Sequence, residues 1–481
     1  MPKVLAIDQG TTATKAYTLD TDGRFVFCSS AEHLQRYPHP GWVEHDPEQL
    51  LENVRDTLDA AGDIDAIGID HQGETIVAWD ARNGKPVYNA IVWQDQRTSE
   101  YIEQLKSDNA EEVTLVRAGL PLDPYFSAAK FRWILKNVPT AGQLAAAGHL
   151  MMGTSDSFFL YRLTGRFATD VTAASRTSLM NIHTCRWDPV LCELFDIPME
   201  CLPPIQTTTG YFGDLKRNGR KIPIHACIVD QQAALMGHGC FAPGEIKATF
   251  GTGVFALANV GTKLKNDLPG GILPTIAWQF HGEPPLYAVD AGVYNAGSAI
   301  NWIRRLRLFD DFLEIERFEK DPAVTRGICF VPALSGLACP FWDRTAAGLW
   351  IGMDLDTSRM DLCQAVLEGI VFRTAQLLDE VSQLTGKTER LSVDGGLTLN
   401  AYFCQFLADV SGREIVVQAS PDITTYGTGR LALLGSGLVK SISELPPPAP
   451  PKRIVRPQRD LSPLKSRFEE AIARSQNWRR S

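Results

Sequence analysis

The sequence lacks the motifs of several common protein classes. It has no Walker A motif, no His-Glu-x-x-His motif and no Gly-x-Gly-x-x-Gly after its first apolar strand, so the P-loop, zincin and dinucleotide-binding patterns are excluded. No apolar run is long enough to cross a membrane, and the N-terminus lacks a charged and then apolar leader. We therefore expect a cytoplasmic protein without a membrane span.

The chain also has fewer basic than acidic residues and lacks Cys-x-x-Cys pairs. Lys and Arg number 47 against 56 Asp and Glu, and the net charge of −9 disfavours a nucleic-acid partner and favours a small ligand. The ten cysteines form no Cys-x-x-Cys pair and lie mostly in apolar strings, so we interpret them as reduced core thiols. With 481 residues the chain is too long for a single core and fits two large domains.

The sequence does contain a polar turn between two apolar strands near the N-terminus. The strands are Val4–Ile7 and Ala16–Leu19, and the turn is Asp8-Gln9-Gly10-Thr11-Thr12-Ala13-Thr14-Lys15. Gly10 lets the backbone approach an anion, N–H groups and hydroxyls can donate to a phosphate, and Asp8 can hold Mg²⁺ through water. Taken alone, such a turn is more often a plain tight hairpin than a phosphate site.

A second copy of this hairpin lies near the middle of the chain. Ile246–Phe250 leads into Gly251-Thr252-Gly253 and continues through Val254–Asn259. Two halves that each offer a phosphate-binding hairpin resemble the architecture of the actin, Hsp70 and sugar kinase superfamily. This resemblance concerns the fold and leaves the function open.

Caps and spacing predict further elements. Asp46-Pro47-Glu48-Gln49 predicts the start of a helix, Ile64–Asp70 a buried strand that runs into His71-Gln72-Gly73-Glu74, and Ile76–Asp80 the next strand. In the second half we expect a strand over Leu391–Asp394, a helix over about 401–410 and another helix after Gly427-Thr428-Gly429. The proline-rich stretch 445–451 predicts a stiff linker into a short C-terminal helix that packs back on the body.

Several short strings occur in order along nearly the whole chain, namely Pro40–Pro47, Gly84–Gln94, Asp123–Leu135, Asp230–Leu235, Phe250–Gly253, Gly348–Gly352 and Val393–Gly396. Together they resemble the FGGY family of carbohydrate kinases, and within it most closely the members that act on glycerol. The resemblance implies an α/β fold with two ribonuclease-H-like domains around an ATP-binding cleft. The expected domains are 1–243, with the acceptor and metal site, and 244–445, with the nucleotide site. A proline-rich linker and a C-terminal helix follow over 446–481.

The resemblance also implies an ATP-dependent kinase that phosphorylates a hydroxyl of glycerol or of a related small polyol or sugar, with ATP and Mg²⁺. Asp230 follows the apolar strand 226–229 and matches the family's catalytic aspartate, so it is the expected general base; capping of a helix is the alternative. Asp8 and Asp230 are the expected metal residues. The expected nucleotide contacts are Thr11, Thr12, Ala13, Lys15, Gly251, Thr252, Gly395, Gly396 and Asn400.

The acceptor site departs from the family pattern. Members that act on glycerol carry Gln-Arg-Glu at a strand end, whereas this chain has Gln72-Gly73-Glu74 and lacks the five N–H donors of a guanidinium. The gap favours a larger acceptor such as a tetritol, a pentitol or a ketopentose such as xylulose or ribulose, unless another side chain fills it or Gly73 is a harmless turn. Asp95-Gln96-Arg97 also resembles the Asp-x-Arg pattern of pentulose kinases. The expected acceptor contacts are Gln72, Gly73, Glu74, Trp93, Tyr125, Asp230, Gln231 and Phe255.

Two other functions remain as alternatives. One is an actin- or Hsp70-like ATPase without a small acceptor, which is disfavoured because no separate peptide-binding module follows the second half. The other is an inactive sugar-binding relative, which the presence of Asp8 and Asp230 disfavours. Homo-oligomerisation stays open, and Asn218-Gly219-Arg220 only partly resembles a loop that binds an allosteric sugar bisphosphate in some family members.

Overall fold

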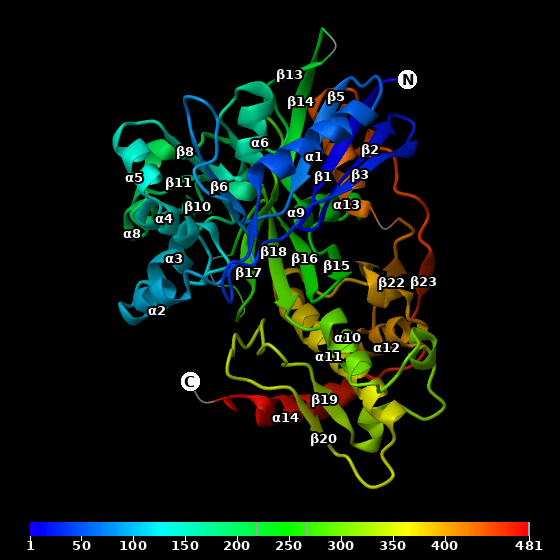
Figure 1. Ribbon diagram of the computed structural model, residues 1–481. Helices are drawn as coiled ribbons and strands as arrows, with labels where there is room; N and C mark the ends of the chain where they lie inside the picture. The colour runs from blue at the N-terminus through cyan, green and yellow to red at the C-terminus, as the bar shows by residue number, and fades with distance from the viewer. Residues whose placement is uncertain (218, 266–267, 269, 421, 480–481) are drawn as a thin grey trace. The chain divides into compact units, whose positions relative to one another are not determined.

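The computed structural model describes residues 1–217, 219–265, 268, 270–420 and 422–479 (Figure 1). Asn218 of the partly matching regulatory loop lies outside the described residues. The chain divides into two compact units: unit 1 is Met1–Gly239, Pro274–Tyr287 and Asp422–Pro448, and unit 2 is Cys240–Leu273, Ala288–Pro421 and Ala449–Ser481. These units differ from the predicted domains 1–243, 244–445 and 446–481 chiefly in the segments 274–287 and 422–448, which belong to unit 1.

Unit 1 is built on a six-stranded sheet of β1 (Lys3–Gln9), β2 (Ala13–Asp20), β3 (Phe25–Glu32), β5 (Ala66–His71), β13 (Asp214–Arg217) and β14 (Arg220–Val229). The strand order is β13-β14-β5-β1-β2-β3. β1 and β14 both pair with β5 in parallel, whereas β1, β2 and β3 form an antiparallel meander. β5 is buried along its whole length, as expected for an inner parallel strand.

A smaller sheet and the helices complete unit 1. Asp46 caps α1 as predicted and accepts a hydrogen bond of 3.0 Å from the backbone N–H of Glu48. The smaller sheet has the order β4-β7-β6-β8, from β4 (Glu44–His45), β6 (Ile76–Asp80), β7 (Ala90–Ile91) and β8 (Leu150–Thr154). The helices are α1 (Pro47–Ala60), α2 (Ser99–Ser107), α3 (Glu111–Arg117), α4 (Ser127–Asn137), α5 (Pro139–Ala146), α6 (Ser155–Thr164), α7 (Val171–Ala174), α8 (Pro189–Leu194), α9 (Asp230–Gly237) and α13 (Ile423–Gly435). Short strands are β9 (Thr169–Asp170), β10 (Met180–Asn181), β11 (Arg186–Trp187) and β12 (Ile205–Gln206), and β17 spans Leu273–Trp278.

Helix α13 brings residues from late in the sequence onto the N-terminal sheet. In Figure 1 this orange helix lies beside the blue strands β1 and β2, and it also contacts α9. The prediction of a helix only after Gly429 is wrong, because Gly427 and Gly429 lie inside α13. Close packing explains these helix-weakening glycines: a Cβ at Gly427 would collide with the carbonyl oxygen of Ala233 in α9.

The proline-rich stretch begins packed on α13. The Tyr426 hydroxyl donates to the carbonyl oxygens of Pro446, at 3.0 Å, and Pro447, at 2.7 Å. Arg430 Nε also donates to the Pro446 carbonyl at 3.0 Å. The first prolines are therefore anchored to unit 1, in addition to being stiff.

Unit 2 repeats the pattern of unit 1 with β15 (Ile246–Phe250), β16 (Val254–Gly261), β18 (Leu286–Val293), β21 (Arg390–Asp394), β22 (Glu414–Val417) and β23 (Arg453–Val455). β15 and β16 form an antiparallel hairpin, and β15, β21 and β22 pair in parallel, as β1, β2, β5 and β14 do in unit 1. This repetition confirms the predicted α/β class with two ribonuclease-H-like halves. The remaining elements are β19 (Cys329–Val331), β20 (Leu349–Ile351), α10 (Gly297–Arg305), α11 (Arg359–Thr385), α12 (Ala401–Ser411) and α14 (Lys465–Ser475).

The C-terminal helix and the cysteines behave as predicted. α14 packs Phe468, Ala471 and Ile472 into the core of unit 2. All ten cysteines are free, and eight of them are buried. No helix within the described ranges has the length and apolar character needed to cross a membrane.

Candidate active site

Three parallel strands of unit 1 end at one edge of the sheet, and predicted acceptor and metal residues follow them there. Asp8, near the end of β1, pairs in register with Asp70 of β5, and β5 pairs with β14 up to the last residue of each strand. Gln72–Glu74 directly follow β5, and Asp230 directly follows β14. The carboxyl ends of parallel strands are where α/β proteins bind ligands. The structure thus brings Asp8, the acceptor segment and Asp230 to the same edge.

Asp8 and Asp70 form a carboxyl pair. The sequence predicted Asp70 at the end of a strand but indicated no role for it in the site. Both carboxyls accept from α13: Thr428 Oγ1 donates to Asp70 Oδ2 at 2.5 Å, and Thr425 Oγ1 donates to Asp8 Oδ2 at 3.4 Å. Burial and the charge of Asp8 raise the pKa of the Asp70 carboxyl well above its ordinary value, and burial also raises the pKa of Asp8. The hydrogen bond between the two carboxyls lowers the pKa of Asp8 and raises that of Asp70, so Asp70 is the member that retains a proton more readily.

Asp230 is the first residue of α9. The N-cap of this helix is Val229, so the interpretation of Asp230 as the cap is wrong. The position places the carboxylate at the positive end of the helix dipole, which stabilises the anionic form that a general base requires. The charge of Asp230 also contributes to the raised pKa of Asp70, because the two carboxyls are close enough to interact.

The first hairpin tip is held by side chains from other parts of unit 1. Trp93 Nε1 donates to Thr11 Oγ1 at 3.1 Å, and His33 Nε2 lies 2.9 Å from the carbonyl oxygen of Thr11. Thr12 is exposed at the tip, and Ala13 is the first residue of β2. The predicted phosphate contacts therefore lie on a tip whose position is fixed before any ligand binds.

Lys15 lies on β2, where its ammonium is engaged in an ion pair. Its Nζ donates to Asp422 Oδ1 at 2.8 Å, and the Tyr17 hydroxyl donates to Asp422 Oδ2 at 2.5 Å. The hydrogen bond to Asp422 raises the pKa of Lys15 and keeps it charged. This pairing competes with the predicted contact of Lys15 to phosphate, which stays a proposal.

Glu74 has an unusual backbone conformation at the end of the acceptor segment. Its φ of 56° lies in the left-handed region, which residues other than glycine rarely adopt, and its side chain is buried. Arg176 Nε donates to Glu74 Oε1 at 2.6 Å, and Ser127 Oγ donates to the Glu74 carbonyl oxygen at 3.1 Å. Such strain persists only where the surroundings hold it, and these contacts hold the Glu74 carboxylate in one place.

Arg176 is a residue of this site to which no sequence pattern pointed. Its guanidinium carbon lies 5.7 Å from the centre of the Tyr125 ring and 5.4 Å from that of Phe126, besides pairing with Glu74. It therefore brings a guanidinium to two predicted acceptor residues, although Gly73 brings none. Arg176 lies 102 positions after Glu74, in no motif, so only the tertiary structure reveals it.

The aromatic acceptor residues Trp93 and Tyr125 contact each other, and a buried lysine binds the backbone of the segment that carries Tyr125. The rings of Trp93 and Tyr125 meet edge to face, with centres 5.7 Å apart. Lys130 Nζ donates to the backbone carbonyl oxygens of Tyr125 and Phe126. Lys130 is fully buried, and this burial lowers the pKa of its ammonium to about 8. The segment that carries Tyr125 is thus fixed by a buried donor.

The Asp-x-Arg resemblance to pentulose kinases corresponds to a buried ion pair. Arg97 donates to Asp95 Oδ2 at 2.8 Å and to Glu44 Oε1 at 2.7 Å, and its guanidinium lies 3.8 Å from the centre of the Trp42 ring. A guanidinium that is paired twice and stacked in the core has a structural role. The structure therefore favours a structural role for Arg97 over a contact with the acceptor.

The backbone conformation of Gly73 is one that residues with a side chain can adopt. Gly73 has no positive φ; in this segment Glu74 has it. A Cβ at Gly73 would lie 3.0 Å from Cγ1 of Val229, so Val229 would have to move by a few tenths of an ångström. The backbone does not require glycine at this position.

The predicted nucleotide residues of unit 2 also gather at one sheet edge. Thr249 of β15 pairs with Asp394 of β21, so the tip Gly251-Thr252 and the pair Gly395-Gly396 follow two neighbouring parallel strands. Gly395 has a φ of 94°, and a Cβ there would collide with the carbonyl oxygen of Phe250. At Gly396 a Cβ would meet open space.

The predicted contact residues Asn400 and Phe255 have different surroundings in unit 2. The Asn400 side chain caps α12, accepting from the backbone N–H of Phe403 at 2.8 Å, and its Nδ2 donates to the Ile315 carbonyl at 2.8 Å. Phe255 is half-buried on β16. Asn400 therefore has a clear structural role, and its contact to a nucleotide stays a proposal.

Comparison with known proteins decides the family. Residues 3–237 match the N-terminal domain of the FGGY family of carbohydrate kinases, and residues 246–435 match its C-terminal domain. This chain belongs to the FGGY family. As a member of the family it is an ATP-dependent phosphotransferase with an alcohol group as acceptor, as the sequence predicted.

Its similarity to other FGGY kinases extends over nearly the whole chain. It is 41% identical to a glycerol kinase of Limosilactobacillus reuteri, covering 92% of this chain and 91% of that protein. It is 39% identical to a glycerol kinase of Corynebacterium efficiens, covering 92% and 91%. The solved structure of Plasmodium falciparum glycerol kinase with ADP superimposes with a TM-score of 0.92 at 33% identity, covering 99% and 98%. A xylulose kinase of Lactobacillus acidophilus, at 22% identity and a TM-score of 0.86, shares the fold.

Proposed function

We propose that this FGGY kinase transfers the γ-phosphoryl group of Mg-ATP to a hydroxyl of glycerol or of a closely related small polyol. The observation that carries the proposal is the convergence of Asp230, the Asp8–Asp70 pair and Glu74 with Arg176 at one edge of the unit 1 sheet. The relatives named glycerol kinases support glycerol as the first acceptor to test. A cytoplasmic location and homo-oligomerisation remain predictions.

Each side chain has a role in this proposal. The Glu74 carboxylate, held by Arg176, accepts a hydrogen bond from an acceptor hydroxyl, and the Trp93 and Tyr125 rings pack against its carbon edge. Asp230 takes the proton of the reacting hydroxyl while the hydroxyl oxygen bonds to the γ-phosphorus of ATP. The bond between that phosphorus and the bridging oxygen breaks, and ADP leaves with this oxygen. Thr11 and Thr12 in unit 1, and Gly251 and Thr252 in unit 2, are proposed to donate to the phosphates.

The carboxylates at this edge fit a magnesium ion. Mg²⁺ prefers oxygen ligands and usually binds one or two carboxylates together with water and substrate phosphates. Asp8 and Asp230 supply such carboxylates, and the raised pKa of Asp70 limits the negative charge that this third carboxyl adds. We propose that Asp8 and Asp230 would hold Mg²⁺, which when bound would supply positive charge to the phosphates.

A larger acceptor is the second candidate, and the observation that favours it is Gly73. Arg176 brings a guanidinium beside Glu74, but from a different segment than the arginine expected at position 73. Because position 73 is glycine, the volume that an arginine side chain would fill is left open. The site differs in this respect from the pattern expected of members that act on glycerol. This difference favours a tetritol, a pentitol or a ketopentose.

An acceptor panel tests the proposed function. With Mg-ATP in a coupled ADP assay, we expect ADP release to be slow without an acceptor and to rise strongly with the right alcohol, because acceptor binding completes the site. Glycerol, tetritols, pentitols and ketopentoses form the panel, and product phosphate esters are identified by mass. If no member raises ADP release above the acceptor-free rate, the proposal of a small polyol or sugar acceptor is wrong.

Gly73→Arg tests the origin of acceptor preference. We expect a lower KM for glycerol and a higher KM for larger acceptors, since a guanidinium adds charge-assisted hydrogen bonds and fills volume; about 1.5–3 kcal/mol is the upper limit for such bonds. Gly73→Ala is the matched control, because it adds only the Cβ that meets Val229. If both variants unfold, or if the wild type already binds glycerol with micromolar affinity, the enlarged-site interpretation is wrong.

A further inference from the structure

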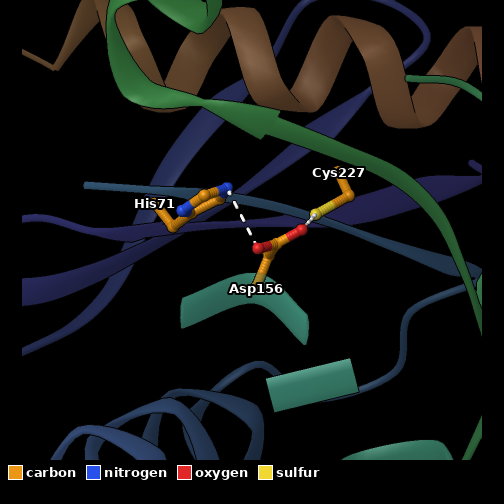
Figure 2. Close-up of side chains that lie close together, drawn as sticks. All are labelled: His71, Asp156 and Cys227. Atoms are coloured by element: carbon orange, nitrogen blue, oxygen red, sulfur yellow. Dashed lines mark hydrogen bonds and ion pairs between the residues drawn. The ribbon is translucent and has the colours of Figure 1, made fainter. Parts of the chain in front are cut away.

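A cluster of three buried side chains lies next to the acceptor segment and has no role in the proposed reaction. His71 is the last residue of β5, Cys227 lies on the neighbouring β14, and Asp156 is the second residue of α6. Figure 2 shows the three side chains pointing toward one another. All three residues are fully buried, and their nearest nitrogen, sulfur and oxygen atoms lie within 4.8 Å of one another.

The Nε2 atom of His71 faces the Asp156 carboxylate at a distance too long for a hydrogen bond. Nδ1 lies 3.2 Å from the carbonyl oxygen of Gln72 and 3.1 Å from the hydroxyl oxygen of Ser155, and in the tautomer with the hydrogen on Nδ1 it donates to the carbonyl oxygen, which can only accept. In the neutral ring Nε2 then presents a lone pair, and it points at Asp156 Oδ1, 3.8 Å away, with no hydrogen-bond partner. Two electron-rich atoms facing each other in the core are unfavourable unless a positive charge lies between them.

The other side of Asp156 faces a sulfur atom. Cys227 Sγ lies 3.8 Å from Asp156 Oδ2, while Nε2 of His71 faces the opposite oxygen, Oδ1. The carboxylate is oriented by Thr154 Oγ1, which donates to Oδ1 at 2.5 Å, and by Thr169 Oγ1, which donates to Oδ2 at 2.8 Å. Oδ2 also accepts from the backbone N–H of Asp170 at 3.3 Å. These donors orient the carboxylate as donors to a metal-binding carboxylate do, and they leave Oδ1 a further lone pair toward His71.

We propose that His71, Asp156 and Cys227 form a buried binding site for a divalent transition-metal ion, to which each residue contributes one ligand atom. One imidazole nitrogen, one thiolate sulfur and a carboxylate are ligands typical of Zn²⁺. A tetrahedral zinc ion with bonds of about 2.0–2.3 Å separates neighbouring ligand atoms by roughly 3.3–3.7 Å. The two separations from Asp156 are 3.8 Å, and the three ligand atoms all lie within 4.8 Å of one another, so metal binding requires inward movements of up to about 1 Å.

Binding at this site releases a proton. The thiol of Cys227 loses its hydrogen to solvent, and the resulting thiolate and the carboxylate of Asp156 balance the charge of the ion. The ion links β5 and β14 just before the points where the acceptor segment and Asp230 begin. Because the ligand atoms are fully buried, we expect the ion to enter during folding of unit 1, and then to exchange slowly.

Refolding of the full-length chain with metal tests this site. We expect wild type refolded with Zn²⁺ and washed with a weak chelator to retain about one ion per chain, counted by plasma mass spectrometry. With Co²⁺ in place of Zn²⁺, a cobalt–thiolate charge-transfer band should appear in the near ultraviolet. Cys227→Ala should abolish this band and lower metal affinity at least tenfold, and His71→Asn should also lower affinity at least tenfold.

Cys192→Ala is the matched control, because Cys192 is another buried thiol of unit 1. It should retain the ion and the cobalt band. The proposal is overturned if folded wild type retains no ion, if its cobalt form shows no thiolate band, or if Cys227→Ala retains as much metal as wild type. The wild-type spectrum decides the question even where Cys227→Ala fails to fold. Failure here does not affect the proposed kinase activity.

Discussion

Replacing Asp230 by asparagine is expected to lower kcat by about a hundredfold or more while leaving nucleotide affinity nearly unchanged. Asparagine keeps the size of the side chain and its place as first residue of α9, but it cannot accept the proton of the acceptor hydroxyl. The loss of a charge near the helix N-terminus costs only about 0.3–1 kcal/mol of stability. The variant should therefore fold and bind ADP, yet turn over slowly.

Kinetics, nucleotide binding and folding need to be measured together for Asp230→Asn. Asp46→Asn is the matched control, because Asp46 caps α1 and asparagine caps helices about as well as aspartate. The control should keep kcat within about twofold of wild type. A decrease of less than tenfold for Asp230→Asn would show that Asp230 is not the general base.

Local patterns in the sequence were sufficient to predict the strand-end residues of the site. Asp8 and Asp230 each follow an apolar strand, and the carboxyl ends of neighbouring parallel strands meet at one edge of a sheet. The hairpin tips of both halves were predictable for the same reason, because glycine and threonine between two apolar strands mark a turn. These features depend on residues that are adjacent in the chain.

Contacts across long distances in the sequence were not predictable. Lys15 pairs with Asp422 across 407 positions, and Asp70 accepts from Thr428 across 358 positions, both because α13 packs on the N-terminal sheet. The glycines of α13 reduce its intrinsic helix propensity, and only close packing explains them: Gly427 packs against α9, and Gly429 packs against Leu19 of β2. Tertiary packing therefore explains the two kinds of feature that the sequence did not predict correctly: the start of α13 and the long-range partners of Lys15 and Asp70.

Replacing Arg176 by methionine is expected to lower the free energy of unfolding by about 3–5 kcal/mol, because it leaves the Glu74 carboxylate charged and buried without its partner. The same change should raise the KM of the acceptor, since Glu74 would no longer be held toward the hydroxyl. Chemical denaturation and acceptor kinetics measure the two effects. Arg132→Met is the control, because Arg132 pairs with a half-exposed Asp196 and its loss should cost less than about 1 kcal/mol.

A double variant separates the structural role of Arg176 from its role in acceptor binding. In Arg176→Met with Glu74→Gln, the buried charge is gone, so much of the lost stability should return. Activity should stay low, because the glutamine amide replaces the carboxylate that accepts from the acceptor hydroxyl. If activity returns together with stability, Glu74 and Arg176 only support the fold. If Arg176→Met alone costs no more stability than Arg132→Met, the ion pair does not hold Glu74 in its strained conformation.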